Sequence, residues 1–327
     1  MRIIALVESL EHVCARYRTL AFAKPLLNSN IMIELIALPK GILSRQKLLW
    51  SLKGKHVIVL RKLLNWIDWR ILRKRAKWIA FELDDAVYLR DSYSEKGFND
   101  NRRMARFERI VAESDIVIAG NNHLAKEVLA HGAKGRVSVI PTCVDTNKYR
   151  QKEDYSTEIL LTLVWIGSSS TLQGLNRFKS SLENLGKMVS DIQLKLICDK
   201  FINFNHLKTI HCPWSEFTET SELANSDVGI SWIPDDPWSK GKCGLKLIQS
   251  MAAGLPVIAN PIGVHPEMIA QGINGYLVNS SDEWINAING LKNQKNLREM
   301  MGRNGRKLVE KSYSIEFGLK KWLEILK

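Results

Sequence analysis

Short apolar runs alternate with segments of helical periodicity along the first half of the chain. Continuously apolar runs of strand length are typical of parallel strands that are covered on both faces. The expected strands are Ile3–Val7, Ile31–Leu38, His56–Leu60, Trp78–Leu83, Ile116–Ala119 and Val137–Ile140. The helical patterns between them are Arg16–Leu27, Leu63–Ala76, Asn101–Glu113 and Asn122–His131. This alternation predicts a doubly wound α/β domain.

The same alternation restarts after a polar stretch. Pro141 ends the last of these strands, and the charged run Arg150–Glu158 is typical of a linker. The strands expected beyond it are Ile159–Ile166, Leu194–Cys198, Val228–Trp232 and Val257–Ala259. The expected helices are Leu172–Met188, Ser221–Asn225, Gly244–Ala253, Glu283–Gly290, Asn296–Lys311 and Ile315–Leu326. We predict two domains, residues 1–152 and 153–312, with a last helix in 313–327 that can cross back to the first domain.

Composition agrees with two globular domains. The chain has 327 residues, of which 45% are hydrophobic and 25% are charged. Its five cysteines are scattered without C-x-x-C spacing, which favours reduced thiols and a cytoplasmic protein. Apolar runs stay well short of the roughly 18 residues of a membrane span. We interpret the first apolar run as a buried strand because Glu8 interrupts it early.

The positive charge is concentrated in one half. Residues 1–152 hold 28 Lys/Arg against 15 Asp/Glu, whereas residues 153–327 hold 19 of each. The segment Arg61–Lys77 combines tryptophans with seven basic residues, which suits the inner face of an anionic membrane. The predicted contacts are Arg61, Arg70, Arg73, Lys74 and Arg75. A packed helix with a solvated basic face is the alternative. We see no recognition motif for nucleic acid and expect none to bind.

The most informative segment is Asp235–Ile258, a turn-rich loop followed by a helix and a strand. Gly244 lets the backbone approach a ligand, and the amides of the helix start attract an anion. Lys242 and Lys246 add positive charge nearby. These features predict a diphosphate site, although a helix start with two solvated lysines has the same pattern.

This segment resembles the donor-site helix of glycosyltransferase family 4, whose pattern runs roughly E-x-F-G-L-x-x-x-E-A-M-A-x-G-x-P-V-I. The matching positions are Gly244, Leu245, Met251, Ala252, Gly254, Pro256, Val257 and Ile258. Val139–Tyr149 and Gly272–Val278 resemble further parts of the family, so the likeness covers nearly all of residues 139–325. The K-G-K-C-G-x-K form is similar to a branch found among surface-polysaccharide enzymes.

The resemblance implies a GT-B fold, with two Rossmann-like domains facing a central cleft. It also implies a retaining transfer of sugar from a nucleotide sugar to a cell-surface glycan or lipid-linked acceptor. UDP is the expected nucleotide, and no other cofactor is expected. A catalytically idle binding or scaffold protein, and a sugar-nucleotide epimerase or hydrolase of the same fold, remain alternatives. Neither H-x-x-x-H spacing nor a D-x-D signature occurs, so we expect no metal site.

The family's donor-site residues map only in part onto this chain. Two glutamates contact the donor in the family, and Gly241 and Gln249 stand at their positions here. Gln249 can still bond a ribose hydroxyl. The family's basic residues after the first strand of the second domain are replaced by a Gly-Ser-Thr loop, which can bind phosphate. The expected donor-binding residues are Gly167, Ser168, Ser170, Thr171, Trp214, Lys242, Gly244, Leu245, Lys246 and Gln249.

Candidate catalytic residues come from both halves. Asp84 and Asp85 close a strand at the end where α/β domains bind ligands, so they can hold an acceptor hydroxyl or act as a base. A role in capping a helix is the alternative. Asp236 is a candidate for the lost contact with the sugar. Arg16 and Arg18 follow the first strand, where an arginine can reach the diphosphate across the cleft.

Overall fold

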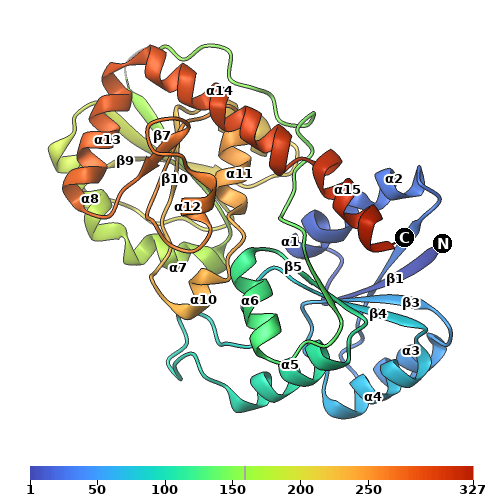
Figure 1. Cartoon of the computed structure of the whole chain (residues 1–327). Helices are drawn as coiled ribbons and strands as arrows, with labels where there is room; N and C mark the ends of the chain where they lie inside the picture. Colours follow the sequence, from blue (N-terminus) through green and yellow to red (C-terminus); the bar gives the residue numbers. More distant parts are fainter. Residues whose placement is uncertain (158–159, 327) are drawn as a thin grey trace. The chain divides into compact units, whose positions relative to one another are not determined.

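A computed structural model of the chain describes residues 1–157 and 160–326. They form two compact units (Figure 1). Unit 1 contains Met1–Cys143, the short segment Asp236–Cys243, and the last helix, α15 (Ile315–Leu326). Unit 2 contains Val144–Asp235 and Gly244–Ser314. Residues 236–243 were expected in the second domain, but the structure includes them in unit 1.

Unit 1 is built on a parallel sheet of six strands in the order β2-β1-β3-β4-β5-β6. The strands are β1 (Arg2–Val7), β2 (Met32–Ala37), β3 (His56–Leu60), β4 (Trp78–Leu83), β5 (Ile116–Ala119) and β6 (Arg136–Val139). The helices are α1 (Val13–Ala15), the π-helical turn η1 (Arg16–Leu20), α2 (Ala21–Leu27), α3 (Ile42–Ser51), α4 (Trp66–Arg75), α5 (Asn101–Glu113), α6 (Asn122–Ala130), α10 (Pro237–Lys240) and α15.

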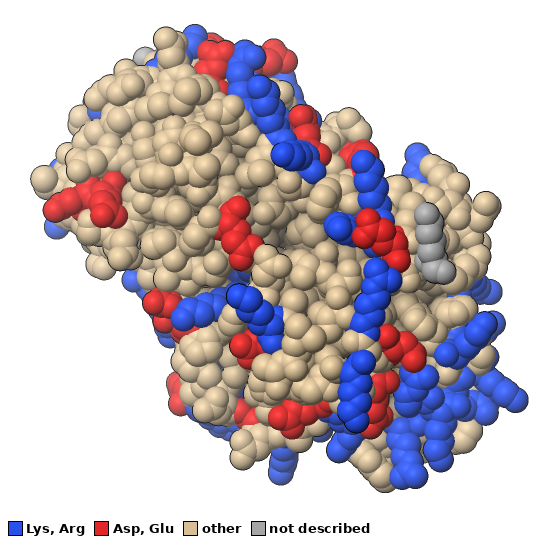
Figure 2. Space-filling view, viewed as in Figure 1, with Lys and Arg blue, Asp and Glu red and all other residues tan. Residues whose placement is uncertain are grey.

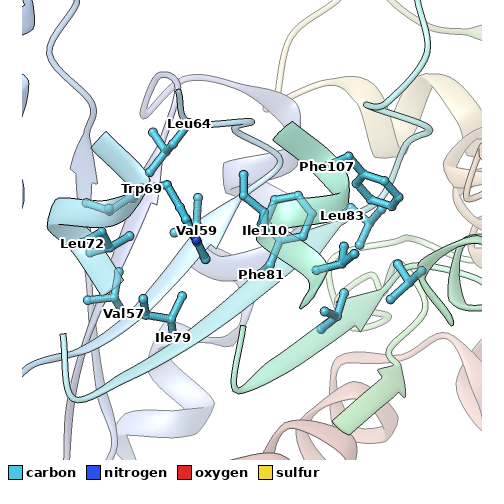
Figure 3. Packing of buried hydrophobic residues seen from close by; sticks show 14 of the residues in the cluster. Val57, Val59, Leu64, Trp69, Leu72, Ile79, Phe81, Leu83, Phe107 and Ile110 are labelled. Carbon is cyan, nitrogen blue, oxygen red and sulfur yellow. The ribbon is translucent and has the colours of Figure 1, made fainter. Parts of the chain in front are cut away.

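Alternate residues of each strand point to opposite faces of this sheet, and both faces are buried. One face packs against α3, α4, α5 and α6, and Figure 3 shows Trp69 and Leu72 of α4 and Ile110 of α5 near the strand residues Val59 and Phe81. The opposite face packs against α2 and α15, through side chains that include Phe22 and Trp322. Helices on both faces are what the continuously apolar strands predict.

Unit 2 is a second parallel sheet, with strand order β12-β11-β10-β7-β8-β9. The strands are β7 (Leu161–Ile166), β8 (Ile192–Cys198), β9 (Lys208–Pro213), β10 (Val228–Ser231), β11 (Val257–Ala259) and β12 (Gly275–Leu277). The helices are α7 (Ser169–Arg177), α8 (Lys179–Met188), α9 (Glu219–Ala224), α11 (Leu245–Ala252), α12 (His265–Met268), α13 (Ser281–Asn293) and α14 (Lys295–Ser312).

Helices α7, α8 and α13 pack on one face of this second sheet. Helix α11 lies against β10 and α14. The predicted α/β class with two doubly wound sheets is confirmed. Two expectations differ in detail: the single helix Leu172–Met188 is two helices that meet at Phe178, and the strand expected from Ile159 begins at Leu161. Ile159 itself lies outside the described residues.

Candidate functional site

In unit 1, the two predicted aspartates lie just beyond the carboxyl end of β4, between β3 and β5. Arg61 binds both of them, with its Nε 3.1 Å from Asp84 Oδ1 and its Nη2 2.8 Å from Asp85 Oδ2. Burial alone would raise the pKa of Asp84, but the charges of Arg61 and Arg18 outweigh it and the pKa is lowered. Asp84 is therefore held as a carboxylate, which can accept a proton or a hydrogen bond but cannot donate one.

Arg61 has a strained backbone. Its φ of 59° lies in the left-handed region that residues with a side chain seldom adopt. Its amide donates to the carbonyl of Glu82 at 2.7 Å, and this bond and the two aspartates hold the residue in place. Backbone strain of this kind is concentrated at functional sites. The prediction that Arg61 contacts a membrane is wrong, because its guanidinium is bound within this cluster.

Lys242 also belongs to this group, and its contacts differ from the predicted ones. Its Nζ lies 2.9 Å from Asp85 Oδ1 and 3.4 Å from the centre of the Trp238 ring. The expected diphosphate contact is not supported, since the ammonium is already paired with a carboxylate of unit 1. We call Arg61, Asp84, Asp85 and Lys242 the aspartate cluster.

The backbone of the segment Asp236–Cys243 is held against the rest of unit 1. Asn121 Nδ2 donates to the carbonyls of Gly241 and Lys242 at 3.0 and 3.1 Å. A Cβ at Gly241 would lie 2.8 Å from the backbone nitrogen of Ala86, so this position has no room for a side chain. The packing gives a physical reason why glycine stands where the resembled family has a glutamate.

Two further predicted residues have structural partners. Asp236 caps the short helix α10 by accepting from the Ser239 amide at 2.7 Å. Arg18 is only 1% exposed, and its Nε donates to Glu82 Oε1 at 2.6 Å while its Nη2 donates to the Ile140 carbonyl at 2.8 Å. The predicted diphosphate contact of Arg18 is therefore wrong, because a buried carboxylate already takes its charge.

Arg16 stays a candidate. Its guanidinium lies 4.8 Å from the centre of the Tyr17 ring, in the π-helical turn after β1, and its side chain is partly exposed.

In unit 2, two predicted donor residues meet at the start of α11. Lys246 Nζ lies 3.4 Å from Thr171 Oγ1 and 5.2 Å from the centre of the Trp165 ring. Gly244, immediately before the helix, has a φ of 68°, and a Cβ there would lie 2.6 Å from Met268 Sδ. Glycine is therefore required both by the backbone and by the packing. Leu245 is the first residue of the helix.

The Gly-Ser-Thr loop forms the start of α7. Ser168 caps that helix together with Thr171, and Ser168 Oγ lies 2.8 Å from Ser170 Oγ. A Cβ at Gly167 would lie 2.4 Å from the Trp165 ring, so glycine allows the indole to pack there. The Ser169 amide donates to Asp199 Oδ1 at 2.6 Å, and hydrogen bonds from Ser169 lower the pKa of Asp199. The Ser169 amide at this helix start thus already holds an anion, a contact that the sequence did not predict.

A third group in unit 2 connects the residues predicted for the base and the ribose. Trp214 Nε1 donates to Glu219 Oε2 at 2.8 Å, and Gln249 Nε2 donates to Tyr149 Oη at 3.2 Å. Tyr149 Oη in turn donates to Glu219 Oε1 at 3.4 Å. Glu219, Tyr149 and Gln249 are buried, whereas Trp214 is exposed. We call these four residues the Glu219 network. Trp214 and Gln249 were predicted from the sequence, whereas no sequence motif identifies Glu219.

His265 lies near Lys246 and is almost completely buried. Its Nδ1 lies 2.8 Å from the Asn260 carbonyl, and its Nε2 lies 3.3 Å from Ser231 Oγ. Burial lowers the pKa of His265 to about 4, so its ring is neutral near pH 7.

Neither a metal-binding cluster nor a membrane-spanning helix occurs in the part of the chain that the structure describes. In residues 1–157 and 160–326, no three His, Cys, Asp or Glu side chains are grouped so that they could hold a metal ion. Over those same ranges, every helix is too short or too polar to cross a bilayer.

The chain is similar both to a family model and to individual proteins that are described as glycosyltransferases. Residues 237–308, which include α11, match the model of the family described as glycosyl transferases group 1. Spore coat protein SA of Bacillus subtilis is 21% identical over 277 residues, or 73% of this chain and 72% of that protein. An uncharacterised glycosyltransferase of Methanocaldococcus jannaschii is 24% identical over 232 residues, or 69% of this chain and 61% of that protein.

Solved structures share the fold along the whole chain. Sucrose-phosphate synthase from Thermosynechococcus elongatus superimposes with a TM-score of 0.75 at 14% identity, covering 100% of this chain and 98% of that one. Anabaena HepE, in complex with UDP and glucose, gives 0.72 at 18% identity and covers 100% and 99%. Both likenesses extend over the two α/β units.

Proposed function

We propose that this chain, a glycosyltransferase with the GT-B fold, moves a sugar from UDP onto a cell-surface glycan or lipid-linked acceptor. We further propose that the transfer retains the anomeric configuration and needs no metal ion. The observation that carries the proposal is the meeting of Lys246 and Thr171 at the start of α11, in the same unit as Trp214 and Gln249. Support for UDP comes from Anabaena HepE, which was crystallised with UDP and with UDP-glucose.

Breaking the bond between sugar and diphosphate releases negative charge onto the departing nucleotide. An ammonium and a hydroxyl placed at that oxygen stabilise the charge as it develops. Lys246 and Thr171 supply both groups from neighbouring elements of unit 2. Lys242 is not needed in this role, which agrees with its ion pair to Asp85.

The acceptor requires different chemistry, and the aspartate cluster provides it. An acceptor hydroxyl must lose its proton as it attacks the sugar, and an ionised carboxylate can receive that proton or orient the hydroxyl. The low pKa of Asp84 favours this form. Arg61 and Lys242 fix the positions of both carboxylates, so we assign acceptor binding to Asp84 and Asp85.

We also propose that unit 1 binds the inner face of an anionic membrane, where a lipid-linked acceptor would be found. Residues 40–77 hold twelve Lys/Arg and one Asp/Glu, and Figure 2 shows basic side chains gathered over the region where Figure 1 places α3 and α4. Leu43 of α3 is 83% exposed and Trp66 of α4 is 51% exposed. Exposed apolar and aromatic side chains among basic ones are typical of surfaces that enter the interface of a bilayer.

The basic residues of α4 have distinct neighbours. Arg70 lies over the Trp66 ring at 5.2 Å and Arg75 lies over the Trp50 ring at 4.9 Å. Arg73 is paired with Asp115 at 2.7 Å, whereas Lys74 is exposed. We therefore assign the membrane contact to Arg70, Lys74 and Arg75 with the two tryptophans, and a smaller share to Arg73.

Flotation with vesicles tests this surface. The wild-type chain should float with vesicles that contain phosphatidylserine and remain below with vesicles of phosphatidylcholine alone. Leu43→Ser with Trp66→Ser should reduce flotation strongly, whereas Leu129→Ser, which changes an exposed leucine on α6, should not. Equal flotation of all three proteins would exclude α3 and α4 as the membrane contact.

The transfer itself is tested by incubating the wild-type chain with labelled UDP-sugars, with and without a bacterial lipid extract as acceptor. The proposal predicts label in the lipid fraction and UDP release that depends on the extract. Release without acceptor would indicate a hydrolase, and a changed sugar on intact UDP would indicate an epimerase. UDP binding without turnover would favour an idle binding protein, the alternative that the missing glutamate at Gly241 keeps open.

A further inference from the structure

We infer that Glu219 sets the hydrogen-bond direction at the nucleotide site, so that Gln249 presents an acceptor oxygen to the ribose of the donor. This inference rests on the proposed UDP-sugar site in unit 2. Glu219 would thus be a positioning residue. It supplies, from α9, a carboxylate that is absent at position 249 of α11.

The direction of these hydrogen bonds follows from the chemistry of the carboxylate. An ionised carboxylate only accepts hydrogen bonds, whereas a hydroxyl and an amide can each do both. Glu219 accepts from Trp214 through Oε2 and from Tyr149 through Oε1. The Tyr149 hydroxyl must therefore point its proton at Glu219, which leaves its oxygen lone pairs for another donor.

That donor is the amide of Gln249. With its Nε2 bound to Tyr149 Oη at 3.2 Å, the Oε1 of Gln249 lies on the other side of the amide group. A carbonyl oxygen has two lone pairs, so it can accept from a ligand hydroxyl in addition to any other partner. The chain of bonds from Gln249 through Tyr149 to Glu219 has one direction, and the charge of Glu219 fixes it.

The same carboxylate also holds the tryptophan. Trp214 is exposed, and its indole N–H is fixed to Glu219 at 2.8 Å, so the ring has a set orientation. Aromatic faces bind bases by stacking. One buried side chain therefore links the residue proposed for the base with the residue proposed for the ribose.

Burial makes this direction costly to reverse. Glu219 is 5% exposed, and a buried carboxylate needs donors around it. In Glu219→Gln, the carbonyl oxygen is expected to stay with the Trp214 N–H, which turns the new NH₂ group toward Tyr149. The tyrosine hydroxyl would then donate to Gln249, whose amide would turn and offer N–H groups to the ribose.

The experiment measures the affinity of each variant for UDP and for 2′,3′-dideoxy-UDP by calorimetry. Glu219→Gln should weaken UDP binding by about 5- to 10-fold, the equivalent of about one hydrogen bond. It should weaken the dideoxy nucleotide less, so the preference for the ribose hydroxyls falls. Glu222→Gln is the matched control, because Glu222 lies one turn along α9 and pairs with Lys195 instead.

The decisive variant combines Glu219→Gln with Gln249→Glu. The new carboxylate would accept from Tyr149 and still offer an oxygen to the ribose, so the double variant should regain the preference for UDP that Glu219→Gln alone loses. Loss without rescue would overturn the directional role, as would a Glu219→Gln protein that binds like the wild type. If the wild-type chain binds no UDP, the proposed function fails first and the inference fails with it.

Discussion

The pair of Arg18 and Glu82 gives the sharpest stability prediction. Both side chains are almost completely buried, at 1% and 0% exposure, and they meet at 2.6 Å. Replacing Arg18 by methionine keeps a long, unbranched side chain like the methylene stem of arginine. It leaves the Glu82 carboxylate without its charged partner. Breaking a buried ion pair in this way costs about 3–5 kcal/mol, and the bond to the Ile140 carbonyl is also lost. We expect a loss of unfolding free energy of that size at pH 8.

The pH dependence of this loss has a definite sign. Burial raises the pKa of Glu82 to about 7 even with Arg18 present, so without Arg18 the pKa should rise further. A carboxyl group whose pKa is raised in the folded state lowers the free energy of unfolding as the pH rises from its unfolded-state pKa toward its folded-state pKa. The deficit of Arg18→Met should therefore shrink between pH 8 and pH 5, where Glu82 in the folded variant becomes protonated.

Urea denaturation followed by circular dichroism at both pH values measures the effect. The double variant Arg18→Met with Glu82→Gln removes both charges and should recover most of the lost stability at pH 8. The reasoning is refuted if Arg18→Met costs less than about 1 kcal/mol, the scale of an exposed ion pair. A variant with normal stability but weak UDP binding would instead restore Arg18 as a ligand of the diphosphate.

Three further predictions concern the donor site, the acceptor site and pH. Lys246→Ala should weaken UDP binding by about 1.5–3 kcal/mol in calorimetry, as for a lost bond to a charged group, and unchanged affinity would remove Lys246 from the site. Asp84→Asn with Asp85→Asn should abolish transfer in the labelled-sugar assay but leave UDP affinity intact, so normal turnover would reject these residues as the acceptor site. Burial lowers the pKa of His265 to about 4. The neutral His265 ring therefore contributes stability that is present above pH 6.5 and is lost as the pH falls toward 4. The loss should reach about 3 kcal/mol, at 1.36 kcal/mol per pKa unit, and His265→Gln should flatten the profile of unfolding free energy measured in urea.

Most of the fold could be predicted because its strands are short, continuous apolar runs with clear boundaries. Helix α3 was missed because it exposes Ile42, Leu43 and Trp50, which hides the apolar stripe that marks an amphipathic helix. The bounds of strand β9 were not predicted, because the strand lies at the edge of its sheet and is partly polar. The pattern of buried and exposed residues in both elements departs from the simple periods on which sequence interpretation relies.

Residues of the proposed donor and acceptor sites were predicted where they belong to a local sequence motif. Lys246, Gly244 and Gln249 lie within one matched segment, and Asp84 and Asp85 follow a strand, so their general locations were accessible. The partners of Arg18, Arg61 and Lys242 lie between 23 and 157 residues away in sequence, and those partners decide what each cation does. Glu219 was missed for the same reason, since its role depends on contacts with Tyr149 and Gln249 that no local pattern records.

The most direct test of the central claim is a thermal-shift screen of the wild-type chain against UDP, GDP, ADP, CMP and TDP, with NAD as control. A nucleotide at about 100 times its dissociation constant stabilises the folded state by about 2.7 kcal/mol, which raises the melting temperature measurably. We predict a clear rise with UDP, a smaller rise in Lys246→Ala, and none with NAD. If no nucleotide diphosphate raises the melting temperature of the wild-type chain, unit 2 does not hold the proposed donor site.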